Sequence, residues 1–194
     1  MRRYRAVIAA ACVALVAACA TAPPPRPAGD VRIEPAFAAA GRMSARRGND
    51  AIAVHFTWRH AAASDDFDVS TPLGQTVARM RRDASGVSVE RPNEAPVNYP
   101  DWRALTTAVL GVAIPVDGLA YWIQGAPAAQ GNANLERDAA GRPSVLREQG
   151  WDIVYGYPRD DVTQPSRLVM SYPGSEPIEV RIVVDRIDPL PAPS

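Results

Sequence analysis

The sequence contains no lysine, because all 21 of its Lys or Arg positions are arginine. This absence excludes catalysis through a lysine Schiff base and the lysine-dependent phosphate loop of nucleotide-binding proteins. Cysteine is also scarce, and both cysteines, Cys12 and Cys19, lie near the N-terminus. The chain beyond Cys19 can therefore form neither a disulfide nor a cysteine-based metal site.

The longest uninterrupted apolar run covers residues 6–18 and directly follows an arginine-rich start. The run is too short to cross a bilayer, which takes about 20 apolar residues, and it is typical of a signal peptide. It leads into Val-Ala-Ala-Cys, which resembles the site cut by lipoprotein signal peptidase. We therefore predict a lipoprotein signal peptide over residues 1–18 and lipidation of Cys19. The alternative is ordinary cleavage near Ala18 or Ala20, which would leave a free thiol.

Lipidation would place N-acyl and S-diacylglycerol chains on Cys19, and we expect no cofactor beyond these covalent groups. Three chains anchor a protein firmly, since each buried methylene contributes about 0.8 kcal/mol. Ala20 follows the cysteine, whereas lipoproteins retained at the inner membrane typically carry aspartate at that position. We therefore expect a lipid-anchored protein of the outer membrane whose domain faces the periplasm.

Removal of residues 1–18 leaves 18 arginines against 21 acidic residues, a net charge of −3. Because nucleic-acid binding requires a basic surface, we expect no nucleic-acid partner. Residues 19–35 combine the acylated cysteine with a Pro/Ala-rich tether, which is semi-rigid and extended. Residues 189–194 form a Pro-rich tail. Between these segments, residues 36–188 are long enough for one domain with its own core.

Most of this domain alternates apolar and polar residues, which is the pattern of half-buried strands. The clearest examples are residues 52–58, 151–157, 168–172 and 178–184, and further strand candidates are residues 37–47, 66–71, 75–82, 86–91 and 143–149. The middle of the chain differs. Asp101 can cap a helix over residues 102–110, and Pro115 can start a second helix that ends before Gly125.

These patterns predict a mainly β fold with minor α content. The sheet is antiparallel and strongly bent, and the two helices cover its concave side. Such a cover is needed because strands with one apolar face must bury that face against another layer.

No catalytic constellation emerges from the sequence. His55 and His60 fall on opposite faces of one predicted strand, so they cannot share a metal, and we predict surface positions for both. Asp65, Asp66 and Asp68 are predicted to be solvated carboxylates at the start of a strand. The serines lack a nucleophile elbow. These features favour a binding protein that is not an enzyme and holds no metal.

Three groups of segments, taken together and in order, resemble the LolB family of outer-membrane lipoproteins, which receive and insert other lipoproteins. They are Gly41–Ser44 with Phe56–Trp58 and Thr71–Thr76; Leu110–Gly111 with Ile114–Val116 and Leu119–Gly125; and Asp138, Gly141–Arg142, Gln149–Trp151 and Tyr155–Tyr157. The resemblance covers roughly residues 37–185. The chain departs from the family in an abbreviated segment before the first strand, so the family's N-terminal helix is expected to be short or missing. It also lacks a tryptophan closing the last strand, whose extent is left open.

The resemblance implies an eleven-stranded, strongly curved sheet, an incomplete barrel enclosing a hydrophobic cavity. The implied partners are a soluble periplasmic carrier, LolA, acylated lipoprotein clients and outer-membrane lipid, and we expect a monomer. An exposed leucine that the family uses in membrane insertion falls on Leu73. Its neighbours Pro72 and Gly74 independently fit a type I turn, which would expose Leu73 at a hairpin tip.

A triacylated client carries on the order of 40 methylenes, each worth about 0.8 kcal/mol on burial. A receptor for such a client therefore needs a large apolar concavity. The candidate lining residues are Val54, Phe56, Trp58, Phe67 and Val69 from the strands, with Leu105, Val109 and Trp122 from the helices. Each residue can equally belong to a closed core. A scaffold lipoprotein that docks a protein partner is therefore an alternative, and a periplasmic hydrolase is a third, which would need a polar constellation.

Overall fold

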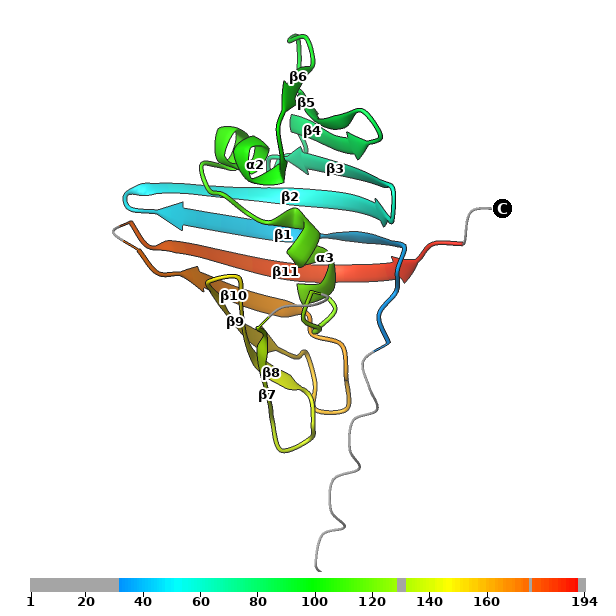
Figure 1. Cartoon of the computed structure of the whole chain (residues 1–194), viewed down its shortest axis with the longest axis vertical. Helices are drawn as coiled ribbons and strands as arrows, with labels where there is room; N and C mark the ends of the chain where they lie inside the picture. Colours follow the sequence, from blue (N-terminus) through cyan, green and yellow to red (C-terminus); the bar gives the residue numbers. More distant parts are fainter. Residues whose placement is uncertain (1–31, 129–131, 175, 192–194) are drawn as a thin grey trace, which may run out of the picture.

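The computed structural model describes residues 32–128, 132–174 and 176–191, so the predicted signal peptide, Cys19, most of the tether and the last tail residues lie outside the described residues. The expectation of a short or missing N-terminal helix also concerns residues that lie largely outside the described ones. In chain order (Figure 1) the elements are β1 (Phe37–Arg47), β2 (Asp50–Ala61), β3 (Ser64–Ser70), β4 (Thr76–Asp83), β5 (Gly86–Glu90), β6 (Val97–Tyr99), α2 (Trp102–Leu110), α3 (Val116–Trp122), β7 (Asn134–Arg137), β8 (Pro143–Glu148), β9 (Trp151–Gly156), β10 (Arg167–Tyr172) and β11 (Ile178–Pro189).

All eleven strands belong to one antiparallel sheet with the order β6-β5-β4-β3-β2-β1-β11-β10-β9-β8-β7. Two meanders build it: β1 to β6 run outward from the centre, and β7 to β11 return from the other edge. The long β1–β11 pair joins the two halves, with Phe37 opposite Pro189. The edges β6 and β7 stand at opposite ends of this order, so the sheet is an incomplete barrel, as predicted.

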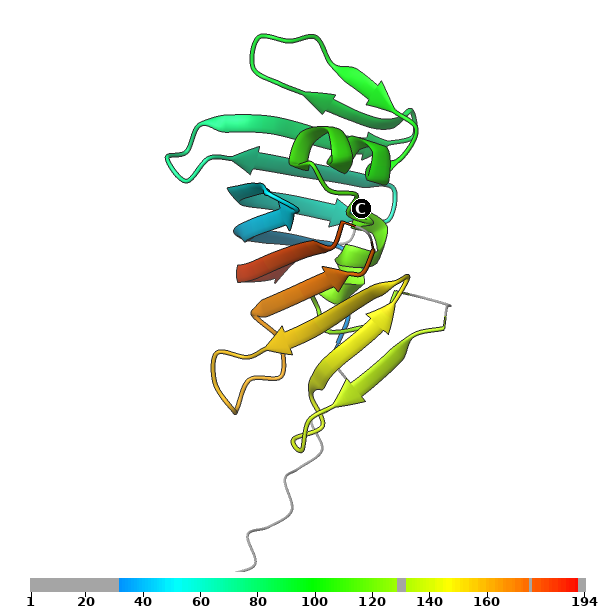
Figure 2. The same cartoon turned by 90° about the vertical axis from the view of Figure 1, so that its left-hand side faces the viewer.

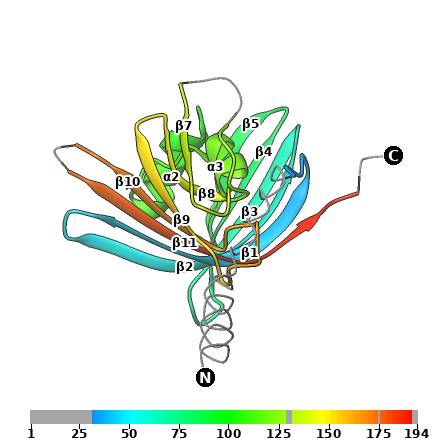
Figure 3. The same cartoon turned by 90° about the horizontal axis from the view of Figure 1, so that it is seen from below.

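The helices lie on the concave side of the sheet, as the sequence predicts (Figures 2 and 3). Asp101 caps α2 by accepting a hydrogen bond from the Ala104 N–H at 2.8 Å, and Gly111 ends the helix with a left-handed φ of 74°. The second helix begins at Val116, because Pro115 keeps an extended conformation and serves as its N-cap. Neither described helix is long and apolar enough to cross a membrane.

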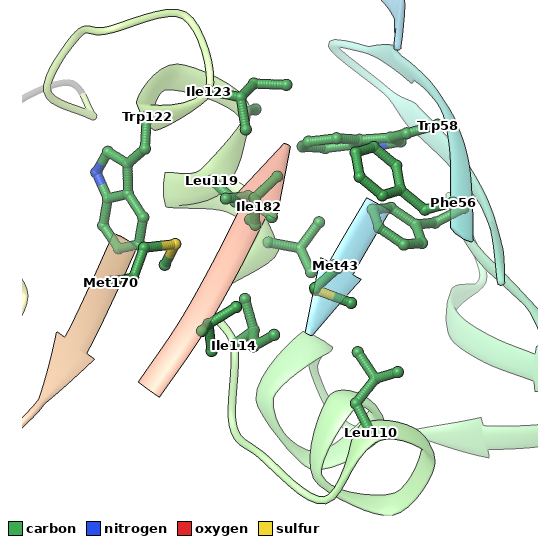
Figure 4. Packing of buried hydrophobic residues seen from close by; sticks show 14 of the residues in the cluster. Met43, Phe56, Trp58, Leu110, Ile114, Leu119, Trp122, Ile123, Met170 and Ile182 are labelled. Atoms are coloured by element: carbon green, nitrogen blue, oxygen red, sulfur yellow. The ribbon is translucent and has the colours of Figure 1, made fainter. Parts of the chain in front are cut away.

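A single apolar core fills the space between the sheet and the helices. The inward residues of the strands alternate with exposed ones, as in β9, whose burial pattern changes at every residue from Trp151 to Tyr155. Figure 4 shows Leu119 of α3 and Ile114 of the linker packed over Ile182 of β11. The sequence missed β6 and β7, because strands of three and four residues are too short to show alternation.

Three breaks in strand register interrupt the sheet. They lie between Ala40 and Gly41, between Val69 and Ser70, and between Glu136 and Arg137. An extra residue in one strand bends it and increases the local twist. At the central break, Gly41 allows close contact between strands, because a Cβ there would clash with the Val183 carbonyl oxygen and lie 3.0 Å from the Phe56 ring.

We predict that Gly41→Ala lowers the free energy of unfolding by about 3 kcal/mol or more, at the upper end of what overpacking costs. The added methyl group would push against a backbone carbonyl, so the β1–β11 pairing must open to accommodate it. Urea unfolding followed by tryptophan fluorescence measures the effect. Gly174→Ala is the matched control, since a Cβ there meets nothing within 4 Å. Equal stability of the two variants would contradict the prediction.

Candidate functional site

The eight residues predicted to line a cavity all come together on the concave side of the sheet. Seven of them are fully buried, and Val109 is partly buried and packs against the same core. The rings of Phe56 and Phe67 stack with centroids 5.5 Å apart, and Trp58 lies 5.4 Å from Phe67. In Figure 4, Trp122 lies at the other end of the cluster, beside Met170. In this conformation the concavity is therefore filled by side chains.

Trp58 is held in place by a buried carboxylate. Asp65 is only 2% exposed, and its Oδ1 accepts hydrogen bonds from Trp58 Nε1 at 2.9 Å and from His60 Nδ1 at 2.7 Å. Its Oδ2 pairs with the Arg82 guanidinium at 2.6 Å. Burial alone would raise the pKa of Asp65, but the hydrogen bonds from His60, Trp58 and Arg82 outweigh it and hold that pKa below its ordinary value.

Two surface positions predicted from the sequence are therefore wrong. Asp65 is buried, and the His60 side chain is only 16% exposed, whereas His55, Asp66 and Asp68 are exposed as predicted. The alternation of β3 indicates that Asp65 is buried, because Asp65 lies on the same face of the strand as Phe67. The prediction treated the three aspartates as one solvated group and therefore missed the burial of Asp65. His60 and His55 do lie on opposite faces, and the described residues contain no group of three side chains suited to a metal.

Trp122 is held by a second buried carboxylate, which the sequence did not single out. Glu148 on β8 is 5% exposed, and its Oε2 accepts from Trp122 Nε1 at 2.7 Å and from the Ala128 N–H at 2.9 Å. The indole also lies against Gly118, where a Cβ would meet the ring at 2.9 Å. Glu148 lies on the same face of β8 as the buried Leu146, and this alternation is the only indication of its burial in the sequence.

One hollow opens from the concave side to solvent. It measures about 320 Å³ and lies between the β1–β2 hairpin and the C-terminal end of α2. Ala45, Ile52, Val109, Leu110 and Val112 supply its apolar walls. The partly buried Val109 therefore stands at an entrance to the core rather than within it.

The predicted turn between β3 and β4 is present, and Leu73 is 90% exposed at its tip. The Gly74 N–H donates to the Thr71 carbonyl at 2.9 Å, the bond that closes a β-turn with Pro72 and Leu73 at its centre. The Gln75 N–H reinforces the turn through Thr71 Oγ1 at 3.2 Å. Figure 2 shows this turn projecting from the sheet on the side away from the helices.

The match to known proteins extends over the whole described domain. Residues 35–186 match the family model described as outer membrane lipoprotein LolB. The outer-membrane lipoprotein LolB of Thiobacillus denitrificans is 37% identical, covering 95% of this chain and 97% of the relative. That of Cupriavidus metallidurans is 35% identical, with 88% and 89% covered. A crystal structure of a LolA superfamily protein from Nitrosomonas europaea shares the fold, with a TM-score of 0.51 at 9% identity over 84% of this chain and 90% of the other.

We predict that Asp65→Asn lowers the free energy of unfolding by about 3 kcal/mol at pH 7, as expected when one partner of a buried ion pair is removed. Because folding lowers the pKa of Asp65, its contribution is fully present above about pH 4 and is lost as the pH falls through the lowered value. The difference between variant and wild type should therefore shrink below pH 4. Urea unfolding at pH 7, 4 and 3 measures it.

Asp66→Asn is the matched control for this prediction. Asp66 is exposed and pairs with Arg81 at 3.1 Å on the outer face, where an ion pair contributes at most about 1 kcal/mol. A loss as large as that of Asp65→Asn, or a loss from Asp65→Asn that does not depend on pH, would contradict the assignment.

Proposed function

Because the chain belongs to the LolB family of outer-membrane lipoproteins, we propose that it receives acylated lipoproteins from a LolA-like periplasmic carrier and inserts them into the outer membrane. The observation that carries the proposal is the apolar inner face of an open sheet, covered by two short helices and their linker. The family comprises lipoproteins that act in lipoprotein localisation, in agreement with the expectation that the chain is not an enzyme.

Entry of acyl chains requires the helices to move. The hollow of about 320 Å³ is at the lower end of the range for pockets that hold a drug-sized ligand, and three acyl chains need more room. Helices of nine and seven residues are too short to be stable alone, so α2 and α3 depend on their contact with the sheet. Burial of apolar surface is non-directional, so acyl chains can replace helix side chains against the sheet at little net cost.

The direction of transfer follows from relative affinities. A client moves from carrier to receptor to bilayer when each site binds its chains more tightly than the one before. We propose that this domain binds acyl chains more tightly than the carrier does and more weakly than the membrane. The covalent groups on Cys19 keep the domain near that final acceptor.

Leu73 is the residue that we propose enters the lipid. A leucine that moves from water into an apolar medium contributes about 1.5–3 kcal/mol. A side chain that is 90% exposed at the tip of a hydrogen-bonded turn can make that move without disturbing the core.

The filled concavity favours a second candidate function. A scaffold lipoprotein that docks a protein partner needs no cavity, and burial of the candidate lining residues fits such a protein as well. The two functions differ in what they bind, since only a receptor takes a client from the carrier.

We predict that Cys19→Ala gives a soluble protein that still removes an acylated client from the loaded carrier. The domain that contains the concavity does not include residue 19, so receipt should be within twofold of wild type. Carrier loaded with a labelled lipoprotein, mixed with the variant and separated by size, measures receipt. No transfer from carrier to either protein would refute the proposed function in favour of a scaffold. Addition of liposomes then tests whether the anchor sets location or takes part in insertion.

We predict that Leu73→Glu leaves receipt from the carrier unchanged but lowers insertion into liposomes at least tenfold. A charged tip is costly to move into lipid, whereas nothing near the core changes. Flotation of the labelled client with liposomes measures insertion. Val154→Glu is the matched control, since Val154 is 50% exposed on β9, outside the turn. Normal insertion by Leu73→Glu, or an equal defect in Val154→Glu, would rule out this function for Leu73.

A further inference from the structure

Three buried polar atoms have no hydrogen-bond partner among the described residues: Trp102 Nε1, Trp151 Nε1 and Tyr155 Oη. Trp151 is 1% exposed and Tyr155 is 8% exposed. A buried donor without a partner is destabilising, so native proteins retain few of them. Two of the three lie on the inward face of the same strand, β9, which suggests a common purpose.

Glu148 belongs to the same corner of the concavity. It stands directly opposite Trp151 in the β8–β9 ladder. Its two hydrogen-bond donors, Trp122 Nε1 and the Ala128 N–H, are both neutral and both belong to the segment that covers the sheet. Burial, with contributions from the nearby Tyr157 and Glu148, raises the pKa of Tyr155, so its hydroxyl remains a donor at neutral pH.

This part of the concavity therefore offers two donors without partners, one O–H and one N–H, and one carboxylate acceptor. Hydrocarbon chains cannot form hydrogen bonds with such groups. The linkage of a lipidated cysteine can form them, because it contains ester carbonyls, which accept hydrogen bonds, and an amide, which both accepts and donates. When the chains enter an apolar site these groups leave water, and each one without a partner is costly.

We propose that Glu148, Trp151 and Tyr155 form a subsite for the ester and amide groups that join the acyl chains of a client to its N-terminal cysteine. The inference rests on the proposed function and adds which part of the client is recognised. Tyr155 and Trp151 donate to carbonyl oxygens, and Glu148 accepts from the amide N–H. When α3 moves off the sheet, Glu148 loses Trp122 as a donor, and the client's amide N–H replaces it.

The test compares two synthetic triacylated lipopeptides that differ only in the glyceryl linkage, one with esters and one with ethers, which lack the carbonyl oxygens. Affinity of the full-length protein for each is measured by displacement of a fluorescent lipopeptide. Wild type should prefer the ester by about 25-fold, the size of two hydrogen bonds. Tyr155→Phe should lower this preference about fivefold without lowering the unfolding temperature, because the hydroxyl has no partner to lose. Trp151→Phe should reduce the preference as well.

Tyr157→Phe is the matched control. The Tyr157 hydroxyl donates to the Pro143 carbonyl at 2.7 Å, so its removal should lower stability and leave the ester preference intact. Equal binding of ester and ether by wild type, or an undiminished preference in Tyr155→Phe, would overturn the subsite while leaving the proposed function standing. If wild type binds neither lipopeptide, the proposed function itself fails and the subsite with it.

Discussion

The structure depends on one constraint: a wide sheet with one apolar face must be covered by the segment that joins its two edges. β6 and β7 lie at opposite ends of the strand order but are consecutive in the chain, so the connection between them has to cross the sheet. The shortest way lies over the concave face, and the segment buries that face as it passes. The sheet and the crossing segment depend on each other, because helices as short as α2 and α3 are stable only against the sheet.

Two buried carboxylates position the aromatic residues of the core, and they differ in how permanently they do so. Asp65 pairs with Arg82 on the neighbouring strand and fixes Trp58 within the sheet itself. Glu148 instead accepts from Trp122 and Ala128, which belong to the crossing segment. Movement of that segment therefore leaves the Asp65 network whole and exposes Glu148. The hydrogen bonds on the β3 side of the concavity lie within the sheet. Those on the β8 side join the sheet to the crossing segment and break when that segment moves.

Sequence alternation predicted the sheet, its bend and the helical cover, because long strands with one buried face leave a strong pattern. Local rules also succeeded at Asp101 and at the turn carrying Leu73, where the interaction spans four residues or fewer. They failed where a polar residue occupies an inward position. Asp65 and Glu148 alternate in phase with apolar neighbours, but their partners lie on other strands, on a helix or in a loop. The sequence alone cannot show that a buried charge has found a partner. Sequence also could not tell a cavity from a core, since the same side chains fill both.

In the proposed function, the position of Leu73 separates the capture of a client from its delivery. The turn projects from the side of the sheet away from the helices, so Leu73 cannot contact chains held in the concavity. In the proposed function, the exposed leucine on this hydrogen-bonded turn orients the domain, because entry of Leu73 into lipid lowers the free energy of the domain. In that function, capture of a client depends on the inner face of the sheet and delivery on the outer one. Both faces belong to one sheet, so the Leu73 turn and the concavity keep a fixed position relative to each other.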